Sequence, residues 1–87
     1  MKKVNIQPGK ILQEAFLIPM GISANKLSIS IGVLQTRISL ILKGERGITA
    51  DTAMRLSKYF GTTPEFWMNL QREYNLRNTK YEIKGDF

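Results

Sequence analysis

Three consecutive polar residues, Gln35, Thr36 and Arg37, stand near the start of a helix that the sequence predicts over about residues 34–43. A glutamine amide can form two hydrogen bonds with N6 and N7 of adenine, and an arginine guanidinium suits guanine or a phosphate. Thr36 can contact a base or the methyl group of thymine, and Leu40 can pack on such a methyl group. We therefore predict that these four side chains face base edges in the major groove of double-stranded DNA.

A second group of residues suits contacts with the phosphate backbone: Lys26, Ser39, Lys43 and Arg46. The net charge is +6, and residues 1–46 hold seven basic side chains against two acidic ones. The positive charge therefore gathers around the candidate helix, as attraction to phosphates requires. Taken alone, the charge also fits a solvated basic face with no nucleic-acid partner.

Residues 23–43 have the pattern that could position these side chains, a helix-turn-helix. Leu27 and Ile31 share one face of a first helix, and Gly32 follows where the chain must turn. Residues 27–31 also alternate in the manner of a strand, but the N-cap signal of Ser23 favours a helix that leaves Ile29 facing outward.

Three more helices complete an all-α prediction. The first begins near Pro8 and is stopped by Pro19 and Gly21, and its expected buried residues are Ile11, Leu12, Ala15 and Phe16. In the helix over residues 34–43, an apolar sector is expected from Leu34, Ile38, Ile41 and Leu42, and Gly44 ends it. A fourth helix runs from Thr49 to Gly61, with an inward face of Ala53, Leu56, Ser57 and Phe60. A fifth covers residues 64–76, so we expect one domain over residues 1–77 and a tail over 78–87 that is a short strand or a frayed end.

The fifth predicted helix carries more apolar surface than one face can bury. Trp67, Leu70 and Tyr74 lie on it at helical spacing. We expect them to form the interface of a homodimer, whose two copies would each bind one half of a palindromic DNA site. The alternative is that Phe66 and Trp67 close a small core.

The composition argues against an enzyme. The chain has no cysteine and no histidine, so a thiol nucleophile, the commonest general base and the commonest metal ligand are missing, and we expect no catalytic residue, metal or cofactor. No apolar run is long enough to span a membrane, and no apolar segment follows the N-terminal lysines. We expect a cytoplasmic protein.

Residues 44–47 also match the GxxG loop of RNA-binding KH domains, but that fold requires strands.

Two long blocks resemble one known family. The segments PGKILQEAFLIPMGIS (residues 8–23) and ITADTAMRLSKYFGTTPEFWMNLQREYNL (residues 48–76) are similar to HigA-type antitoxins. The resemblance covers about residues 6–77. It implies a five-helix, lambda-repressor-like DNA-binding domain that forms a homodimer, binds and blocks a HigB-like mRNA endonuclease toxin, and represses their shared promoter.

The resemblance also supports individual positions. Arg37 and Arg46 stand where the family has basic residues, and Gln35 and Thr36 hold positions that related repressors use for base contacts. Ile29 and Leu40 depart from the family, which usually has charged or polar residues there. Two alternatives therefore stay open: a free-standing repressor with no toxin, and a protein-binding module that has lost operator specificity.

Overall fold

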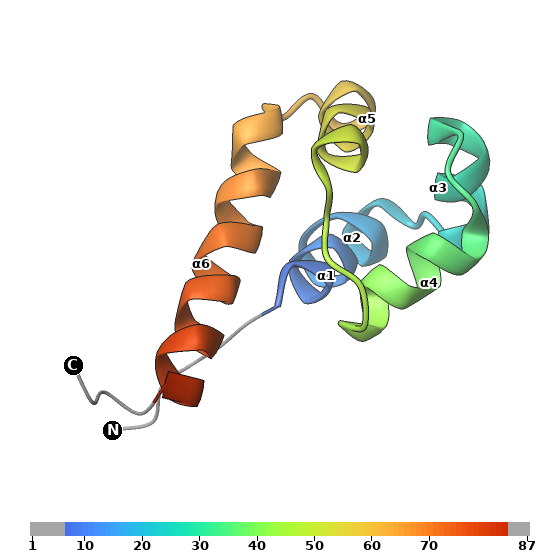
Figure 1. Cartoon of the computed structure of the whole chain (residues 1–87). Helices are drawn as coiled ribbons and strands as arrows, with labels where there is room; N and C mark the ends of the chain where they lie inside the picture. The colour runs from blue at the N-terminus through green and yellow to red at the C-terminus, as the bar shows by residue number, and fades with distance from the viewer. Residues whose placement is uncertain (1–6, 84–87) are drawn as a thin grey trace.

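The computed structural model describes residues 7–83, and side chains through residue 79. Within this part the chain forms helices and no strands, in the order α1 (Pro8–Ile11), a π-helical turn η1 (Leu12–Leu17), α2 (Ile18–Met20), α3 (Ala24–Ile31), α4 (Gln35–Lys43), α5 (Ala50–Phe60) and α6 (Pro64–Ile83). Because α1, η1 and α2 are continuous, they count as one helix, so the predicted all-α, five-helix fold is confirmed. Figure 1 shows α3 and α4 at one end of the molecule and the long α6 at the other. None of these helices is long and apolar enough to cross a membrane.

The N-terminal helix widens before Pro19. Proline lacks an N–H group and its ring clashes with the carbonyl four residues earlier. In η1 the N–H of Ile18 donates instead to the carbonyl of Gln13, five residues back. The wider turn buries Leu12 and Leu17 and leaves Ala15 exposed, so the predicted burial of Ala15 is wrong. The helix ends at Met20, where Gly21 takes a left-handed conformation.

The segment over residues 24–31 is helical, as predicted. The Ser23 hydroxyl accepts a hydrogen bond from the N–H of Lys26 (3.0 Å), and Gly32 closes α3 with φ 73°. Leu27, Ser28 and Ile31 are buried, whereas Ile29 is 72% exposed. A strand would have placed Leu27, Ile29 and Ile31 on one face. The burial of Leu27 and Ile31 without Ile29 therefore excludes the strand and agrees with the helix.

Leu34 does not join the predicted apolar sector of the next helix. It is the N-cap of α4, with an extended backbone (φ −57°, ψ 141°), and its side chain is 76% exposed. Helical spacing does not apply to a residue whose backbone is not helical. Val33 and Ile38, the pair expected to pack across a helix start, are buried in its place.

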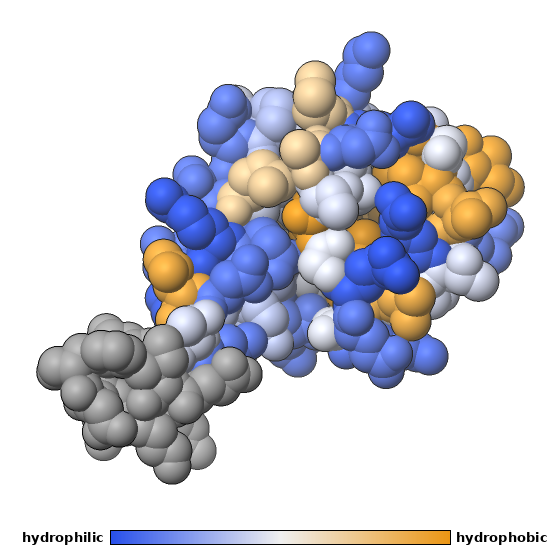
Figure 2. All heavy atoms as spheres, viewed as in Figure 1, coloured by the Kyte–Doolittle hydropathy of each residue, from blue (hydrophilic) through white to orange (hydrophobic). Residues whose placement is uncertain are grey.

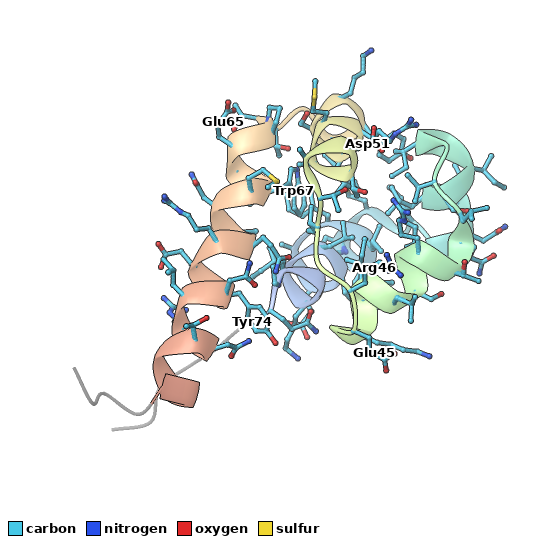
Figure 3. The ribbon with its side chains drawn as sticks, viewed as in Figure 1. Glu45, Arg46, Asp51, Glu65, Trp67 and Tyr74 are labelled. Atoms are coloured by element: carbon cyan, nitrogen blue, oxygen red, sulfur yellow. The ribbon has the colours of Figure 1, made fainter. Side chains whose placement is uncertain are left out.

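Trp67 is the largest fully buried side chain. It lies against Phe16, Phe60 and Phe66, with ring centroids 4.9–6.3 Å away, and its indole N–H donates to the Thr62 hydroxyl (2.7 Å). Figure 3 shows it pointing from α6 toward α5. Because no part of it is exposed in the single chain, it belongs to the core, and its assignment to a dimer interface is wrong.

The last helix is longer than the sequence pattern indicated. We expected it to end near residue 76, but α6 continues to Ile83, so residues 78–83 are neither a strand nor a tail. The remaining predicted tail, residues 84–87, lies outside the described residues.

Candidate nucleic-acid interface

Helix α4 is held on its inner side by α1. A Cβ atom on Gly9 would overlap the backbone carbonyl of Ile41, so only glycine allows the two helices to approach this closely. Beside it, the Gln7 side-chain amide donates to the carbonyl of Leu42 (3.4 Å) and its oxygen accepts from the N–H of Gly9 (3.0 Å). These contacts fix the C-terminal half of α4 against the N-terminal helix.

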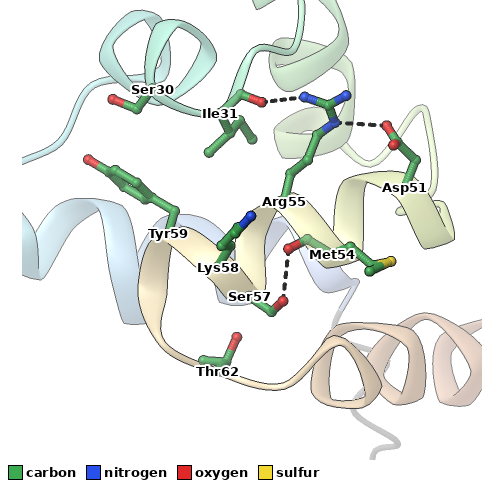
Figure 4. A pocket seen from close by; sticks show the side chains of 9 residues that line it. All are labelled: Ser30, Ile31, Asp51, Met54, Arg55, Ser57, Lys58, Tyr59 and Thr62. Atoms are coloured by element: carbon green, nitrogen blue, oxygen red, sulfur yellow. Dashed lines mark hydrogen bonds and ion pairs between the residues drawn. The ribbon is translucent and has the colours of Figure 1, made fainter.

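Arg55 on α5 braces the start of the turn between α3 and α4. Its guanidinium donates to the carbonyl of Ile31 (2.8 Å), the last residue of α3, and to the carboxylate of Asp51 (3.0 Å) (Figure 4). The bond to Ile31 satisfies a carbonyl that the helix end leaves unpaired, and the positive charge lies near the negative end of the helix dipole. The side chains of Asp51 and Arg55 line a surface groove of about 800 Å³ between α3 and α5.

The loop that leaves α4 is held by α6. The backbone N–H of Ile48 donates to the side-chain oxygen of Gln71 (2.8 Å), and Gly47 lies so close that an added Cβ would be 3.1 Å from the Gln71 amide carbon. Arg46, two residues before Ile48, is exposed in this loop (Figure 3). The loop is therefore anchored on one side of Arg46 while the arginine itself faces solvent.

The outer face of α4 carries Thr36 and Leu40, with Gln35 at its edge, whereas Arg37 lies toward the buried side, four residues before Ile41. Ile38 and Ile41 are fully buried (0% and 1% exposed), which fixes the opposite side of the helix as the outer face. Gln35, Thr36 and Lys43 are exposed, and Arg37, Ser39 and Leu40 are half-buried. A single helix face thus presents amide, hydroxyl and cationic groups together with one leucine side chain.

The basic side chains around α4 are not neutralised within the described residues. The two ion pairs found there are Lys10 with Glu14 and Arg55 with Asp51, both between side chains 44–66% exposed. Lys26, Lys43 and Arg46 are exposed and belong to neither pair. Leu34 is the N-cap of α4 and its side chain forms no hydrogen bond with the first amides of that helix. This end of the molecule therefore offers several donors to an anionic partner.

The structure brings the predicted site residues to α4, to the loop after it and to the start of α3. It also shows positioning residues that sequence reasoning missed, chiefly Gln7, Gly9, Arg55 and Gln71. One signal for Arg55 was present in the sequence, since Asp51 lies four residues before it on the same helix.

Comparison with known proteins gives matches along nearly the whole chain. A helix-turn-helix family model matches residues 12–67. Virulence-associated protein I of Dichelobacter nodosus is 49% identical over 72 residues, which cover 83% of this chain and 67% of that protein. Antitoxin HigA-1 of Vibrio cholerae is 36% identical over 92 residues, covering 100% of this chain and 87% of that protein. The solved structure of the Pseudomonas aeruginosa antitoxin HigA with the higBA promoter is 38% identical, with a TM-score of 0.89 and coverage of 97% and 96% of the two chains.

Proposed function

The chain belongs to the helix-turn-helix family, among the HigA-type antitoxins, and we propose that it binds an operator in the promoter of its own operon and represses transcription. The observation that carries the proposal is the surface of α4 near its N-terminal end, where Gln35 and Thr36 are exposed and Arg37 is half-buried. The C-terminal half of this helix is fixed against the N-terminal helix by Gln7 and Gly9. The fold is shared with an antitoxin whose structure includes promoter DNA.

In this proposal α4 enters the major groove with its N-terminal end first. Gln35, Thr36, Arg37 and Leu40 contact base edges, where a well-formed pair of hydrogen bonds discriminates between bases by about 1–3 kcal/mol. Lys26, Ser39, Lys43 and Arg46 hold phosphates on either side and fix the register of the helix on the duplex.

Binding to a palindromic operator requires a homodimer, and α6 is the element we propose for the interface. Leu70 packs partly against the core and Tyr74, one turn later, is half-buried, whereas Leu76 is 57% exposed on another side of the same helix. A second copy of α6 that packs along the exposed edges of Leu70 and Tyr74 would set the separation between the two copies of α4.

We further propose that the chain neutralises a HigB-like mRNA endonuclease by binding it directly. The support is the similarity to proteins named as HigA antitoxins over the full length of this chain. Operator binding and toxin binding both place the protein in the cytoplasm, and neither requires catalysis. A free-standing repressor is the alternative if no toxin accompanies the gene.

Titration of the upstream DNA at several salt concentrations tests repression. Three basic side chains per copy, six per dimer, should give a slope of log affinity against log salt of about −5, at about −0.9 per phosphate. Binding of the native promoter should exceed binding of random duplex by at least about 1,000-fold. Equal binding to both duplexes would leave the chain without operator specificity and favour a protein-binding module.

Copurification tests the antitoxin role separately. The product of the neighbouring gene, expressed together with a tagged form of this chain, should be retained on the tag and should lose its mRNA-cleaving activity. A repressor that retains no neighbouring product, yet binds its promoter, would be a free-standing regulator.

A further inference from the structure

The N-cap of α4 holds a residue type that is unfavourable there. Ser, Thr, Asp and Asn are preferred at N-caps because their oxygen accepts a hydrogen bond from a free amide of the first turn. The N-caps of α3 and α5 follow this rule, with Ser23 and Thr49 accepting bonds from residues 26 and 52. Leu34 makes no such bond. This chain therefore gives up capping energy at the helix that the proposed function places in the groove.

Packing of the start of α4 against the core does not explain Leu34 either. Val33 and Ile38 already pack across the start of α4, at 9% and 0% exposure. Leu34 is the most exposed large hydrophobic residue among those described, at 76%. Figure 2 shows hydrophobic surface at the end of the molecule formed by α3 and α4. An apolar side chain that neither caps nor packs in the free protein gains most if a ligand covers it.

The position of Leu34 indicates which ligand. It directly precedes Gln35, whose amide suits adenine in the major groove. The thymine methyl group is the one apolar feature that base pairs present in that groove. We propose that Leu34 is a specificity-determining residue that packs on a thymine methyl group beside the base pair that Gln35 contacts, so that the operator half-site contains a thymine there. This proposal rests on the proposed operator binding.

Deoxyuridine provides a direct test, because it differs from thymidine only by the missing methyl group. The probe is a duplex selected from a random-sequence library by the wild-type chain, with each thymine of one half-site replaced in turn by deoxyuridine. We expect one position at which the replacement weakens wild-type binding about fourfold, the change that burial of one methyl group corresponds to. At that position Leu34→Ala should bind both duplexes equally, at the affinity of the wild type for the deoxyuridine duplex.

Two further variants separate this role from others. Leu34→Ser supplies the missing cap and should raise Tm by about 4 °C while it also abolishes the methyl preference. Ile29→Ala, the matched control at an exposed apolar residue of the neighbouring helix α3, should retain that preference. A preference that survives in Leu34→Ala, or that disappears in Ile29→Ala, would assign methyl contact to another residue and overturn the proposal.

The outcomes also distinguish a failure of the proposed role of Leu34 from a failure of the proposed operator binding. If the wild type selects a sequence but is indifferent to every deoxyuridine replacement, operator binding stands and the role of Leu34 is refuted. If the wild type selects no sequence from the library, operator binding itself fails and the inference fails with it.

Discussion

Replacement of Arg55 by methionine tests whether α5 holds the helix-turn-helix in place. Methionine keeps an unbranched apolar side chain but removes the donors to the carbonyl of Ile31 and to Asp51. A hydrogen bond from a charged donor contributes about 1.5–3 kcal/mol. Because the Arg55 side chain is 44% exposed and water can replace part of the bond, we expect a loss of about 1–2 kcal/mol.

Asp51→Asn is the matched control, since it removes the ion pair and leaves the bond to Ile31 in place. Both side chains of the pair are largely exposed, at 44% and 66%, so the pair contributes only about 0.3–0.5 kcal/mol. Loss of the acidic group from the first turn of α5 adds a similar small amount. The control should therefore cost less than about 1 kcal/mol, clearly below the arginine variant.

The chain supplies its own probe for this measurement. Trp67 is its single tryptophan and is fully buried, so its fluorescence reports global unfolding on heating. A loss of about 1–2 kcal/mol should lower Tm by roughly 4–16 °C in a domain of this size. Equal stability of Arg55→Met and the wild type, or equal losses in the two variants, would refute the conclusion that the bond to Ile31 braces the turn.

Three further predictions follow the same physical reasoning. Gly9→Ala should destabilise the fold by at least about 1–3 kcal/mol, because its Cβ would overlap the backbone of Ile41; a wild-type urea midpoint would show that the helices can separate freely. Trp67→Ala should cost about 3–5 kcal/mol by thermal unfolding, against less than about 0.5 kcal/mol for the exposed control Met54→Ala; similar melting temperatures would contradict burial of the tryptophan. Gln35→Ala should leave stability unchanged and lose about 1–3 kcal/mol of base discrimination in competition binding; undiminished discrimination would remove Gln35 from the base-contacting set.

The helix boundaries that sequence reasoning predicted well are those set by local chemistry. Ser23 and Thr49 cap helices through bonds to residues three positions on, and Gly32, Gly44 and Gly61 end helices with positive φ. Each of these signals acts within four residues, so it can be interpreted without knowing the fold.

The misassigned residues lie where the backbone departs from regular α-helix. Ala15 was assigned to the core from a spacing that η1 changes, and Leu34 from a spacing that begins only at Gln35. The extension of α6 beyond residue 76 was missed because its last turns lack an apolar period. At Ala15 and Leu34 the apolar spacing was present in the sequence, but such spacing predicts burial only where the backbone is a regular α-helix.

For the candidate site, the residues that could contact DNA could be predicted from the sequence, but the hydrogen bonds that hold their helix in place could not. Gln7 and Leu42 are 35 residues apart, and Ile48 and Gln71 are 23 apart. No short spacing pattern encodes such pairs, because they depend on how the helices cross. Exposure of Gln35, Thr36 and Lys43 followed from helical periodicity, whereas the contacts that brace α4 emerged only from the structure.

Those bracing contacts have a consequence for how operator binding can change. They act on the backbone of the motif: Gln7 on the carbonyl of Leu42, Arg55 on that of Ile31, and Gln71 on the N–H of Ile48. None of them uses a side chain from the outer face of α4. Substitutions at Gln35, Thr36 or Leu40 should therefore alter operator preference with little effect on folding. This separation would allow the residues of the proposed base-contacting set to vary on a fold that solved relatives share with TM-scores of 0.89 and 0.91.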